Sequence, residues 1–137
     1  MAWSITFEIR GREFRPSLID LNFQRQHDVG VLGTRGRYKG LPYPYGSASY
    51  LAPSDLAHNL RIPHIAKVFV PRLDQLRRAG AEDWHVSIGR YYSAQCNEEF
   101  EAAELTALVE LGCSLTYSAY QVDELEEERL AKEFGYP

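Results

Sequence analysis

Three stretches of this chain alternate apolar and polar residues with a period of two, and no other feature constrains the fold as strongly. They cover residues 4–10, 84–92 and 114–121. Because successive side chains of a strand point to opposite faces of a sheet, each stretch predicts a strand that is buried on one side only. In the first stretch, Ile5, Phe7 and Ile9 are expected to face the core.

Segments with the apolar spacing of helices separate these strands. Helices are expected over residues 16–23, 54–79, 97–111 and 123–134, and two further strands over 35–39 and 47–51, joined by an irregular loop. Too few strands alternate with helices for a doubly wound parallel sheet. The order therefore predicts an α+β fold: a mostly antiparallel sheet of about five strands with helices packed on one face, as a two-layer sandwich.

Capping residues and prolines refine the limits of these helices. Ser54 or Asp55 is expected to cap the second helix, and Asn97 the third. Pro63 and Pro71 each remove a backbone donor and crowd the preceding turn. A kink or break is therefore expected close to each proline.

Composition is ordinary for one globular domain. Of the 137 residues, 45% are apolar and 25% are charged, so residues 1–137 are expected to form a single domain that ends in an acidic helix over 122–137. No stretch approaches the roughly 20 apolar residues of a membrane helix, and no signal peptide is visible. Cys96 and Cys113 form no disulfide framework, which favours a reduced, cytoplasmic protein.

Charge is distributed unevenly along the chain. Residues 1–80 have 12 Lys and Arg against 6 Asp and Glu, a net charge of +6, whereas residues 81–137 have 3 against 13, a net charge of −10. Either the two parts interleave in the fold and mix their charges, or the C-terminal part presents a contiguous acidic face to a basic partner. Only the second alternative predicts a function.

That acidic face would combine carboxylates from the last two helices with aromatic anchors from a loop. Partner binding is assigned to Asp123, Glu124, Glu126, Glu127, Glu128, Glu98 and Glu101, with Tyr43 and Tyr45 as the anchors. Leu105 and Val109 lie away from the core stripe of the third helix, so they are either covered by the C-terminal helix or open to a partner. In the first case, the C-terminal helix would dock through Leu125, Leu130 and Phe134.

A second set of residues predicts anion binding instead. Arg35, Arg37 and Lys39 surround Tyr38, and a hairpin there would present the cations and the ring that phosphate contacts and base stacking require. The net charge of −4 weighs against nucleic acid as the ligand. The alternative interpretation is a solvated edge hairpin whose charges prevent aggregation.

The sequence pattern gives little support to catalytic or metal chemistry. If the chain is a small enzyme, His85, which lies two residues from Asp83, is the candidate catalytic residue. A carboxylate or a thiol would assist it. An exposed histidine on a strand is the ordinary interpretation. The four histidines have neither the spacing nor the cysteine partners of a zinc site, and the glycines between residues 30 and 40 match no phosphate-binding loop. No metal and no cofactor are expected.

A series of short motifs extends over most of residues 1–121. Phe7–Gly11 is followed by the proline-containing Phe14–Ile19, and similar patterns occur at 55–76 and 103–115. In these motifs the chain resembles the domain-of-unknown-function family 4279, with Tyr50 where members commonly have Trp. The resemblance implies a small bacterial cytoplasmic protein. It also implies an immunity function, because some members lie beside toxins and look like immunity proteins.

These observations lead to one main hypothesis and two alternatives. The chain is expected to be a non-catalytic binding protein that resembles an immunity protein and neutralises a basic, nuclease-type toxin through its acidic surface. The first alternative is a nucleic-acid or anionic-ligand binding module that uses Arg35, Arg37 and Lys39. The second is a small hydrolase that uses His85.

Overall fold

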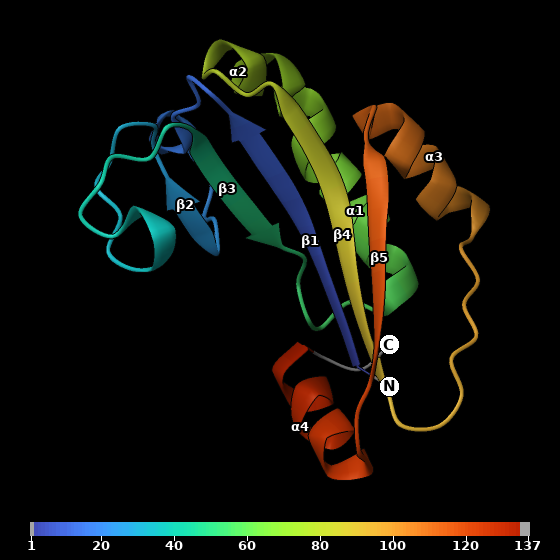
Figure 1. Cartoon of the computed structure of the whole chain (residues 1–137). Coiled ribbons are helices and arrows are strands. Elements are labelled where there is room, and N and C mark those ends of the chain that lie inside the picture. The colour runs from blue at the N-terminus through green and yellow to red at the C-terminus, as the bar shows by residue number, and fades with distance from the viewer. Residues whose placement is uncertain (1, 135–137) are drawn as a thin grey trace.

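A single mixed sheet forms the centre of the molecule. The computed structural model describes residues 2–134, with strands β1 (Ala2–Gly11), β2 (Arg25–His27), β3 (Gly46–Leu51), β4 (Asp83–Tyr92) and β5 (Ser114–Gln121). They lie in the order β2-β3-β1-β4-β5 (Figure 1). All neighbours are antiparallel except β4 and β5, which run parallel because a helix connects them. The predicted α+β class with a mostly antiparallel, five-stranded sheet is confirmed.

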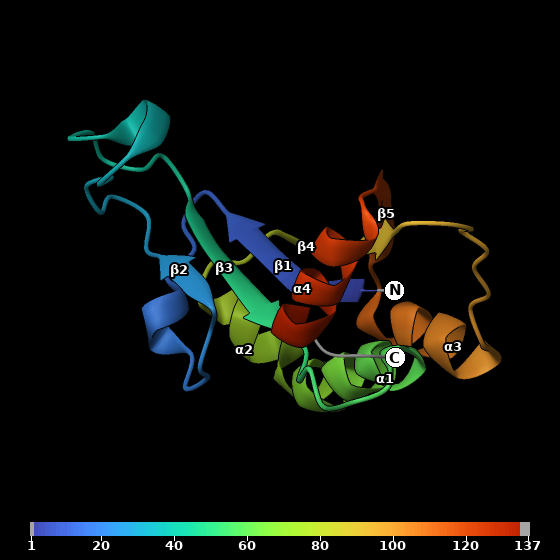
Figure 2. The same ribbon diagram turned by 90° about the horizontal axis from the view of Figure 1, so that it is seen from below.

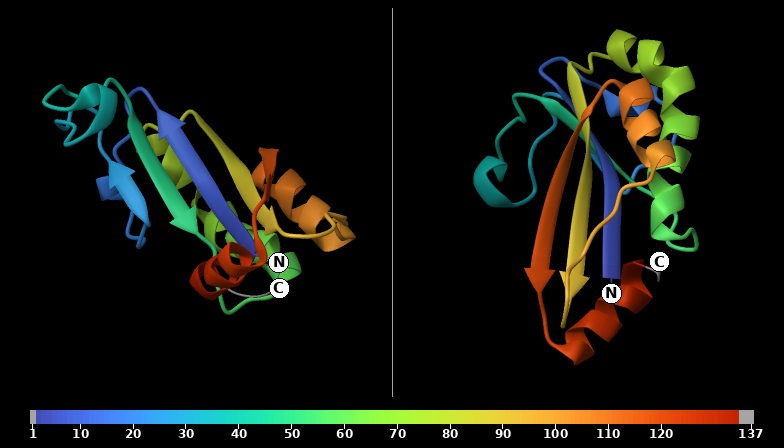
Figure 3. Two further views of the ribbon diagram at one scale, coloured as in Figure 1. Left: turned by 60° about the horizontal axis from the view of Figure 1, so that its bottom comes forward. Right: turned by 90° about the vertical axis from the view of Figure 1, so that its right-hand side faces the viewer.

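Three helices cover one face of this sheet. They are α1 (His58–Phe69), α2 (Leu73–Arg78) and α3 (Ala102–Leu111), and Figure 3 shows them together on one side. Ile5, Phe7 and Ile9 of β1 point into this layer and are at most 1% exposed, as the alternation predicted. The hydrophobic core therefore lies between the sheet and α1–α3.

The last helix, α4 (Glu124–Phe134), lies outside this layer. It crosses the end of the sheet where β1 begins (Figures 1 and 2). Leu130 and Ala131 pack against Ala2, and the Phe134 ring lies parallel to the Tyr91 ring, with 5.9 Å between centroids. The expected covering of Leu105 and Val109 by this helix is wrong: Leu130 and Phe134 pack at the end of the sheet instead, and Leu125 is 80% exposed. The predicted helix over 122–137 extends into residues 135–137, which lie outside the described residues.

α1 begins later than the sequence predicted. Its N-cap is Ala57, so neither Ser54 nor Asp55 caps it. The buried guanidinium of Arg61 donates hydrogen bonds to the carbonyl oxygens of Leu56 (3.0 Å) and Ser54 (3.3 Å). These bonds hold the preceding turn outside the helix, because its carbonyl groups are already satisfied by a side chain.

The two prolines have different effects. Pro63 lies inside α1 and does not break it, because the neighbouring Ile62 and Ile65 are fully buried and their packing holds the helix. Near Pro71 the helix does end, and Val70–Arg72 form a 3-10 turn before α2 begins. Of the kink or break expected near Pro63, the break is wrong, whereas the break expected near Pro71 is confirmed.

α3 also begins later than expected. Its N-cap is Glu101, whose side chain forms a capping box with Glu104, so the prediction of Asn97 as the cap is wrong. The carbonyl group of Asn97 instead accepts a hydrogen bond from the buried Arg90. That contact holds the chain extended for several residues before the helix starts.

The segment between β1 and β3 is less regular than predicted. Only Pro16–Leu18 form a turn of 3-10 helix, because the backbone N–H and hydroxyl of Ser17 donate to the carboxylate of Asp28 and fix the chain there. Residues 35–39 are not a strand, since Gly36–Tyr38 form another 3-10 turn. The predicted basic hairpin therefore does not exist.

Candidate functional site

The face of the sheet opposite α1–α3, here called the open face, is polar. Along β1, β3 and β4 it presents the residues that alternate with the core: Ser4, Thr6, Glu8, Ser47, Ser49, His85 and Ser87. Residues 28–45, here called the roof loop, lie on this side of the sheet, away from α1–α3 (Figure 3). Strands β1–β3 and the roof loop thus enclose space above a polar floor.

A cavity of about 780 Å³ lies in this space and is here called the open-face cavity. Its charged and ring-bearing lining residues are Glu8, Arg25, His27, Arg35 and Tyr43. They come from β1, β2 and the roof loop, so distant parts of the chain meet there. Volumes of this size are typical of small-molecule sites.

Glu8 is the acidic group of the cavity floor. Its Oε1 atom accepts hydrogen bonds from Thr6 Oγ1 (3.0 Å) and from Ser49 Oγ (2.9 Å). Within residues 2–134 no donor is hydrogen-bonded to its Oε2 atom. The two hydroxyl groups fix the position of the carboxylate, and its second oxygen is available to a hydroxyl or ammonium group of a ligand.

A cluster of rings forms the wall between β2 and the roof loop. The His27 ring stacks on Tyr43, with 3.7 Å between centroids and 12° between planes. Tyr45 packs edge-on against both rings and lies under the guanidinium of Arg10, 4.1 Å from it. The rings of this cluster therefore contact one another. They form one wall of the cavity, and their faces are largely taken up by these contacts.

His27 contributes an uncharged imidazole to this wall. Burial lowers its pKa from the ordinary value of 6.5, against the opposing effect of a hydrogen bond to the backbone of Asp28. Its Nδ1 atom is buried and has no hydrogen-bond partner among the described residues. A buried polar atom without a partner is energetically unfavourable.

The residues predicted for anion binding are only partly brought together. Arg35 lines the open-face cavity, whereas Arg37 and Lys39 are exposed at the 3-10 turn and are not among its lining residues. Arg25 was not predicted from the sequence, because the three-residue strand β2 is too short to show alternation. Its position is set by pairing with Ser49 of β3.

The two carboxylates predicted near the start of α3 are engaged by other residues of the protein. Glu98 forms an ion pair with Arg90, at 2.5 Å, and its side chain is only 15% exposed. Glu101 caps α3 and accepts a hydrogen bond from Asn59 (3.2 Å). The assignment of Glu98 to an outward acidic face is therefore wrong, because a buried cation requires a counter-charge.

The carboxylates of the last helix are exposed to different degrees. Asp123 caps α4 through the backbone N–H of Glu126, and the Glu126 carboxylate pairs with Arg129 at 2.6 Å. Glu127 is half-buried, whereas Asp123, Glu124 and Glu128 are exposed.

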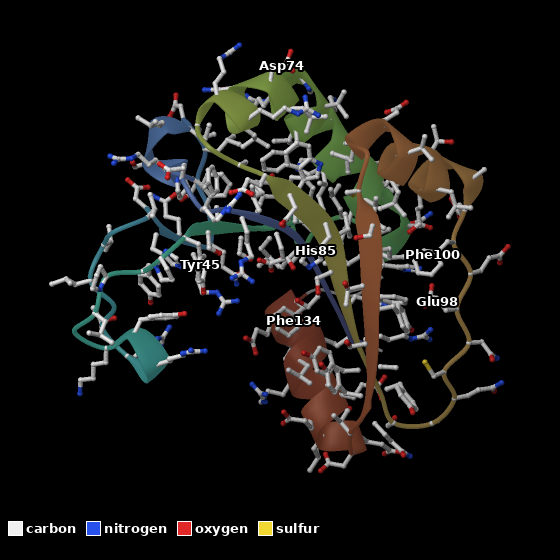
Figure 4. All side chains as sticks on the ribbon, turned by 45° about the horizontal axis from the view of Figure 1, so that its top comes forward. Tyr45, Asp74, His85, Glu98, Phe100 and Phe134 are labelled. Atoms are coloured by element: carbon white, nitrogen blue, oxygen red, sulfur yellow. The ribbon has the colours of Figure 1, made fainter. Side chains whose placement is uncertain are left out.

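The predicted binding set does not lie on one surface. Figure 4 shows Tyr45 and Glu98 on opposite sides of the molecule, with α4 between them at the end of the sheet. Leu105 and Val109 are 50% and 79% exposed, so α4 does not cover them. The contiguous face that would join Tyr43 and Tyr45 to all of the carboxylates does not form.

His85 lies on the open face, directly opposite Glu8 in the β1–β4 pair. It is not among the residues that line the open-face cavity. The imidazole and carboxylate that the enzyme hypothesis requires are therefore adjacent, but only Glu8 lines the open-face cavity.

Comparison with known protein families, with curated proteins and with solved structures finds no match to this chain. The resemblance to family 4279 therefore stays a prediction. The structure defines the chain as an α+β domain whose open face holds a roofed polar cavity.

Two further properties follow from the described part of the chain. Its helices are all too short or too polar to cross a membrane. Within residues 2–134, no three His, Cys, Asp or Glu side chains come together as a group that could hold a metal ion.

Proposed function

We propose that this protein binds a small organic anion in the open-face cavity. The observation that carries the proposal is the convergence of Arg25 and Arg35, from separate segments, on one cavity whose floor is the carboxylate of Glu8. Guanidinium groups bind carboxylate and phosphate through charge-assisted hydrogen bonds. The ligand would place its anionic group between the two arginines.

The carboxylate of Glu8 adds a second requirement. Because its Oε2 atom has no donor within residues 2–134, a ligand hydroxyl or ammonium group is the matching partner. A purely anionic ligand would be repelled by this charge. The cavity therefore favours a molecule with an anionic end and a hydrogen-bond donor, such as a sugar phosphate or a hydroxy acid.

The ring cluster favours a small ligand over a nucleic-acid strand. Base stacking requires an accessible ring face, but Tyr43 stacks on His27 and also contacts Tyr38 and Tyr45. Arg10 covers Tyr45. The net charge of −4 also opposes binding to a long polyanion.

Calorimetric titration with ribose 5-phosphate, inorganic phosphate and ribose tests this proposal. Ribose 5-phosphate should bind most tightly, and binding should weaken as salt concentration rises. Arg25→Gln or Arg35→Gln should each weaken binding by about tenfold or more, since each removes a charge-assisted hydrogen bond.

Matched controls come from the residues that lie outside the cavity. Arg37→Gln and Lys39→Gln each remove one positive charge from the roof loop, which also holds Arg35, and should leave the affinity nearly unchanged. Equal losses in all four variants would show that diffuse surface charge attracts the anion, and the cavity would then have no role. A short single-stranded oligonucleotide that binds better than ribose 5-phosphate would favour the nucleic-acid alternative.

A second candidate function, inhibition of a basic toxin, is supported by the surface of α4. Asp123, Glu124 and Glu128 are exposed there, and Leu125 between them is 80% exposed. An apolar side chain surrounded by carboxylates is a suitable anchor for a basic protein. Carboxylates there would take the place of substrate phosphates at the toxin's active site.

Charge reversal at Asp123, Glu124 and Glu128 tests this second candidate. Association with a nuclease toxin should become slower, most strongly at low salt, because electrostatic steering is screened by ions. Variants that protect and bind as well as the parent would remove α4 from the interface.

The compartment in which either function operates is also proposed. Cys96 and Cys113 are both free thiols, which is usual in a reducing environment. We therefore propose a cytoplasmic location, in agreement with what the resemblance to family 4279 implies.

A further inference from the structure

The outer edge of β5 is a long strand edge without the features that usually protect such edges. β5 is the last strand in the sheet order, so only its β4 side is paired. Proteins usually protect an exposed edge by a short strand, a charged side chain, a proline or a bulge, because an open edge pairs readily with another strand. Residues 114–121 contain no charged residue and no proline, and their register with β4 is continuous. The edge is therefore suited to pairing with a further strand.

The opposite edge of the same sheet is protected. β2 has only three residues, and it begins with the exposed, charged Arg25. Its shortness and its charge both oppose the addition of a further strand. Of the two edges that the described residues form, only that of β5 is suited to pairing.

Every second residue of β5 directs its backbone groups away from β4. Just past the strand, Val122 donates its N–H to the carbonyl oxygen of Tyr92 at the end of β4 (2.9 Å). Because the backbone groups along a strand point alternately to its two sides, the residues an odd number of positions before Val122 point outward. These are Leu115, Tyr117, Ala119 and Gln121. Within residues 2–134, no backbone hydrogen bond joins β5 to a segment other than β4, so these groups remain for a second strand.

The neighbouring residues 93–101 contact side chains of β5 and leave its backbone edge accessible. They reach the Tyr117 side chain through Cys96 (Sγ to Oη, 3.7 Å) and through Phe100 (6.2 Å between ring centroids). Tyr117 lies on the helix-covered face, because its register partner in β4 is the buried Ile88. The right-hand panel of Figure 3 looks onto the β5 edge, and no other described ribbon crosses the strand in that view.

Helix α3 adds an apolar flank beside this edge. On its α1 side, Ala103 and Ala107 line a groove that is shared with α1. A helix turns by about 100° per residue, which places Leu105 and Val109 on the side away from α1. Figures 1 and 2 show α3 on the β5 side of α1. Because Leu105 and Val109 are 50% and 79% exposed, a strand that pairs with β5 would bring its own protein against this flank.

We propose that the β5 edge is a homodimer interface, in which β5 of a second copy pairs with it in antiparallel orientation and the two sheets become one. A two-fold axis makes the pairing self-complementary, because each outward N–H meets a carbonyl group of the other copy. An axis at Tyr117 places Leu115 opposite Ala119, a large side chain against a small one. It also places Thr116 opposite Ser118, which pairs two hydroxyl groups.

Charge favours a second copy as the occupant. The chain has a net charge of −4, but β5 has none, so this pairing brings no like charges of the strands together. A charged foreign strand would find no opposite charge on β5 to select it, whereas a second copy matches a neutral edge with a neutral edge. The apolar flanks of the two α3 helices then face each other. No residue of β5 lines the open-face cavity, so the two proposals succeed or fail independently.

Sedimentation velocity over a series of protein concentrations tests this proposal. The parent should shift from the 15.7 kDa of one chain towards twice that mass. Ala119→Pro removes an outward N–H that the pairing with β4 does not use, and an edge strand tolerates such a proline. The symmetric dimer loses two hydrogen bonds, so its dissociation constant should rise about a hundredfold. Ala119→Thr keeps the N–H and should dimerise as the parent does.

A second pair of variants tests the α3 flank. Val109→Lys places a charge in the interface and should raise the dissociation constant about tenfold or more. Leu18→Lys is the matched control, because Leu18 is 63% exposed and lies in the 3-10 turn beside β2, at the opposite edge of the sheet. It should leave the dissociation constant unchanged.

Hydrogen exchange of the parent supplies a readout that needs no variant. In the monomer, the amides of Tyr117 and Ala119 should exchange rapidly, whereas those of Thr116 and Ser118 are protected by β4. As the protein concentration rises, the Tyr117 and Ala119 amides should become protected as well. Where Ala119→Pro fails to fold, as judged by circular dichroism, this measurement still decides.

Three results would overturn the proposal. The first is a parent mass of 15.7 kDa at every concentration up to millimolar. The second is a dimer that both Ala119→Pro and Val109→Lys leave intact, which would place the interface elsewhere. The third is exchange of the Tyr117 and Ala119 amides at rates that do not depend on concentration. If only an added foreign peptide protects those amides, the edge serves another partner and the homodimer is excluded.

Discussion

The two faces of the sheet belong to the same strands and differ in what covers them. On β1, Phe7 points into the core under α1, whereas its neighbours Thr6 and Glu8 lie on the open face, where Glu8 lines the open-face cavity. The pleat thus places a dry core and a polar binding surface one residue apart. Stability is therefore expected to depend mainly on the helix-covered face and the proposed ligand binding on the open face, so single substitutions should separate the two.

The largest effect is expected from Phe7→Ala. Phe7 is fully buried and packs against Phe69, with 4.5 Å between ring centroids. Loss of the ring should lower the free energy of unfolding by about 3–5 kcal/mol. Thr6→Ala on the opposite face should lower it by only about 1 kcal/mol, the contribution of one hydrogen bond. Urea unfolding measures both, and equal losses would contradict the division between the faces.

The second-largest effect on stability is expected from the loss of an ion pair to a buried charge on the helix-covered side. Glu98→Gln removes a negative charge that is paired with Arg90, which is 1% exposed. The free energy of unfolding should fall by about 3 kcal/mol. Glu99→Gln changes the adjacent, exposed carboxylate and should alter the free energy of unfolding by less than about 0.5 kcal/mol. If thermal unfolding shows the same stability in both variants, the Arg90–Glu98 pair does not support the fold.

The two leucines of α4 extend the comparison to the end of the sheet. Leu130 packs against Ala2 and is 7% exposed, whereas Leu125 is 80% exposed. Leu130→Ala should lower the free energy of unfolding by about 2 kcal/mol, and Leu125→Ala by no more than about 0.5 kcal/mol. Urea unfolding of the pair is the measurement. A large loss with Leu125→Ala would mean that this side chain is covered in solution.

The smallest effect concerns one histidine on each face. Burial lowers the pKa of both His27 and His58 below the ordinary value of 6.5. Below pH 6.5 the unfolded chain therefore binds more protons than the folded protein, so the free energy of unfolding decreases as the pH falls through this range. His27→Phe and His58→Phe should each flatten this dependence. Unfolding curves between pH 7 and pH 5 that are as steep as those of the parent would exclude the two rings as the cause.

Much of the fold was predictable because the signals were local. The alternation in β1, β4 and β5 and the apolar stripe that ends at Gly112 depend only on residues close in sequence. The helix starts were less predictable. Ser54, Asp55 and Asn97 are all good caps in isolation, but Arg61 and Arg90 bind the carbonyl groups of these turns from a distance.

The candidate sites were less predictable than the fold. Arg35 was singled out for anion binding, which stays a prediction, and the hairpin expected to present it does not form. Arg25, His27 and Glu8 meet it only because β2 pairs with β3 and the roof loop folds back over them. A short edge strand has no periodic signal, so no pattern in the sequence could place these residues together.

The sequence by itself determined which face of each long strand is apolar and how unevenly charge is distributed along the chain, because both properties belong to single segments. Only the tertiary structure decided where those charges lie. It pairs Glu98 with Arg90 inside the protein, leaves part of α4 acidic, and collects Arg25 and Arg35 around one cavity. The physical reason is that the interaction between two charges depends on the distance between them in space. That distance is set by the packing of segments that are far apart in the chain.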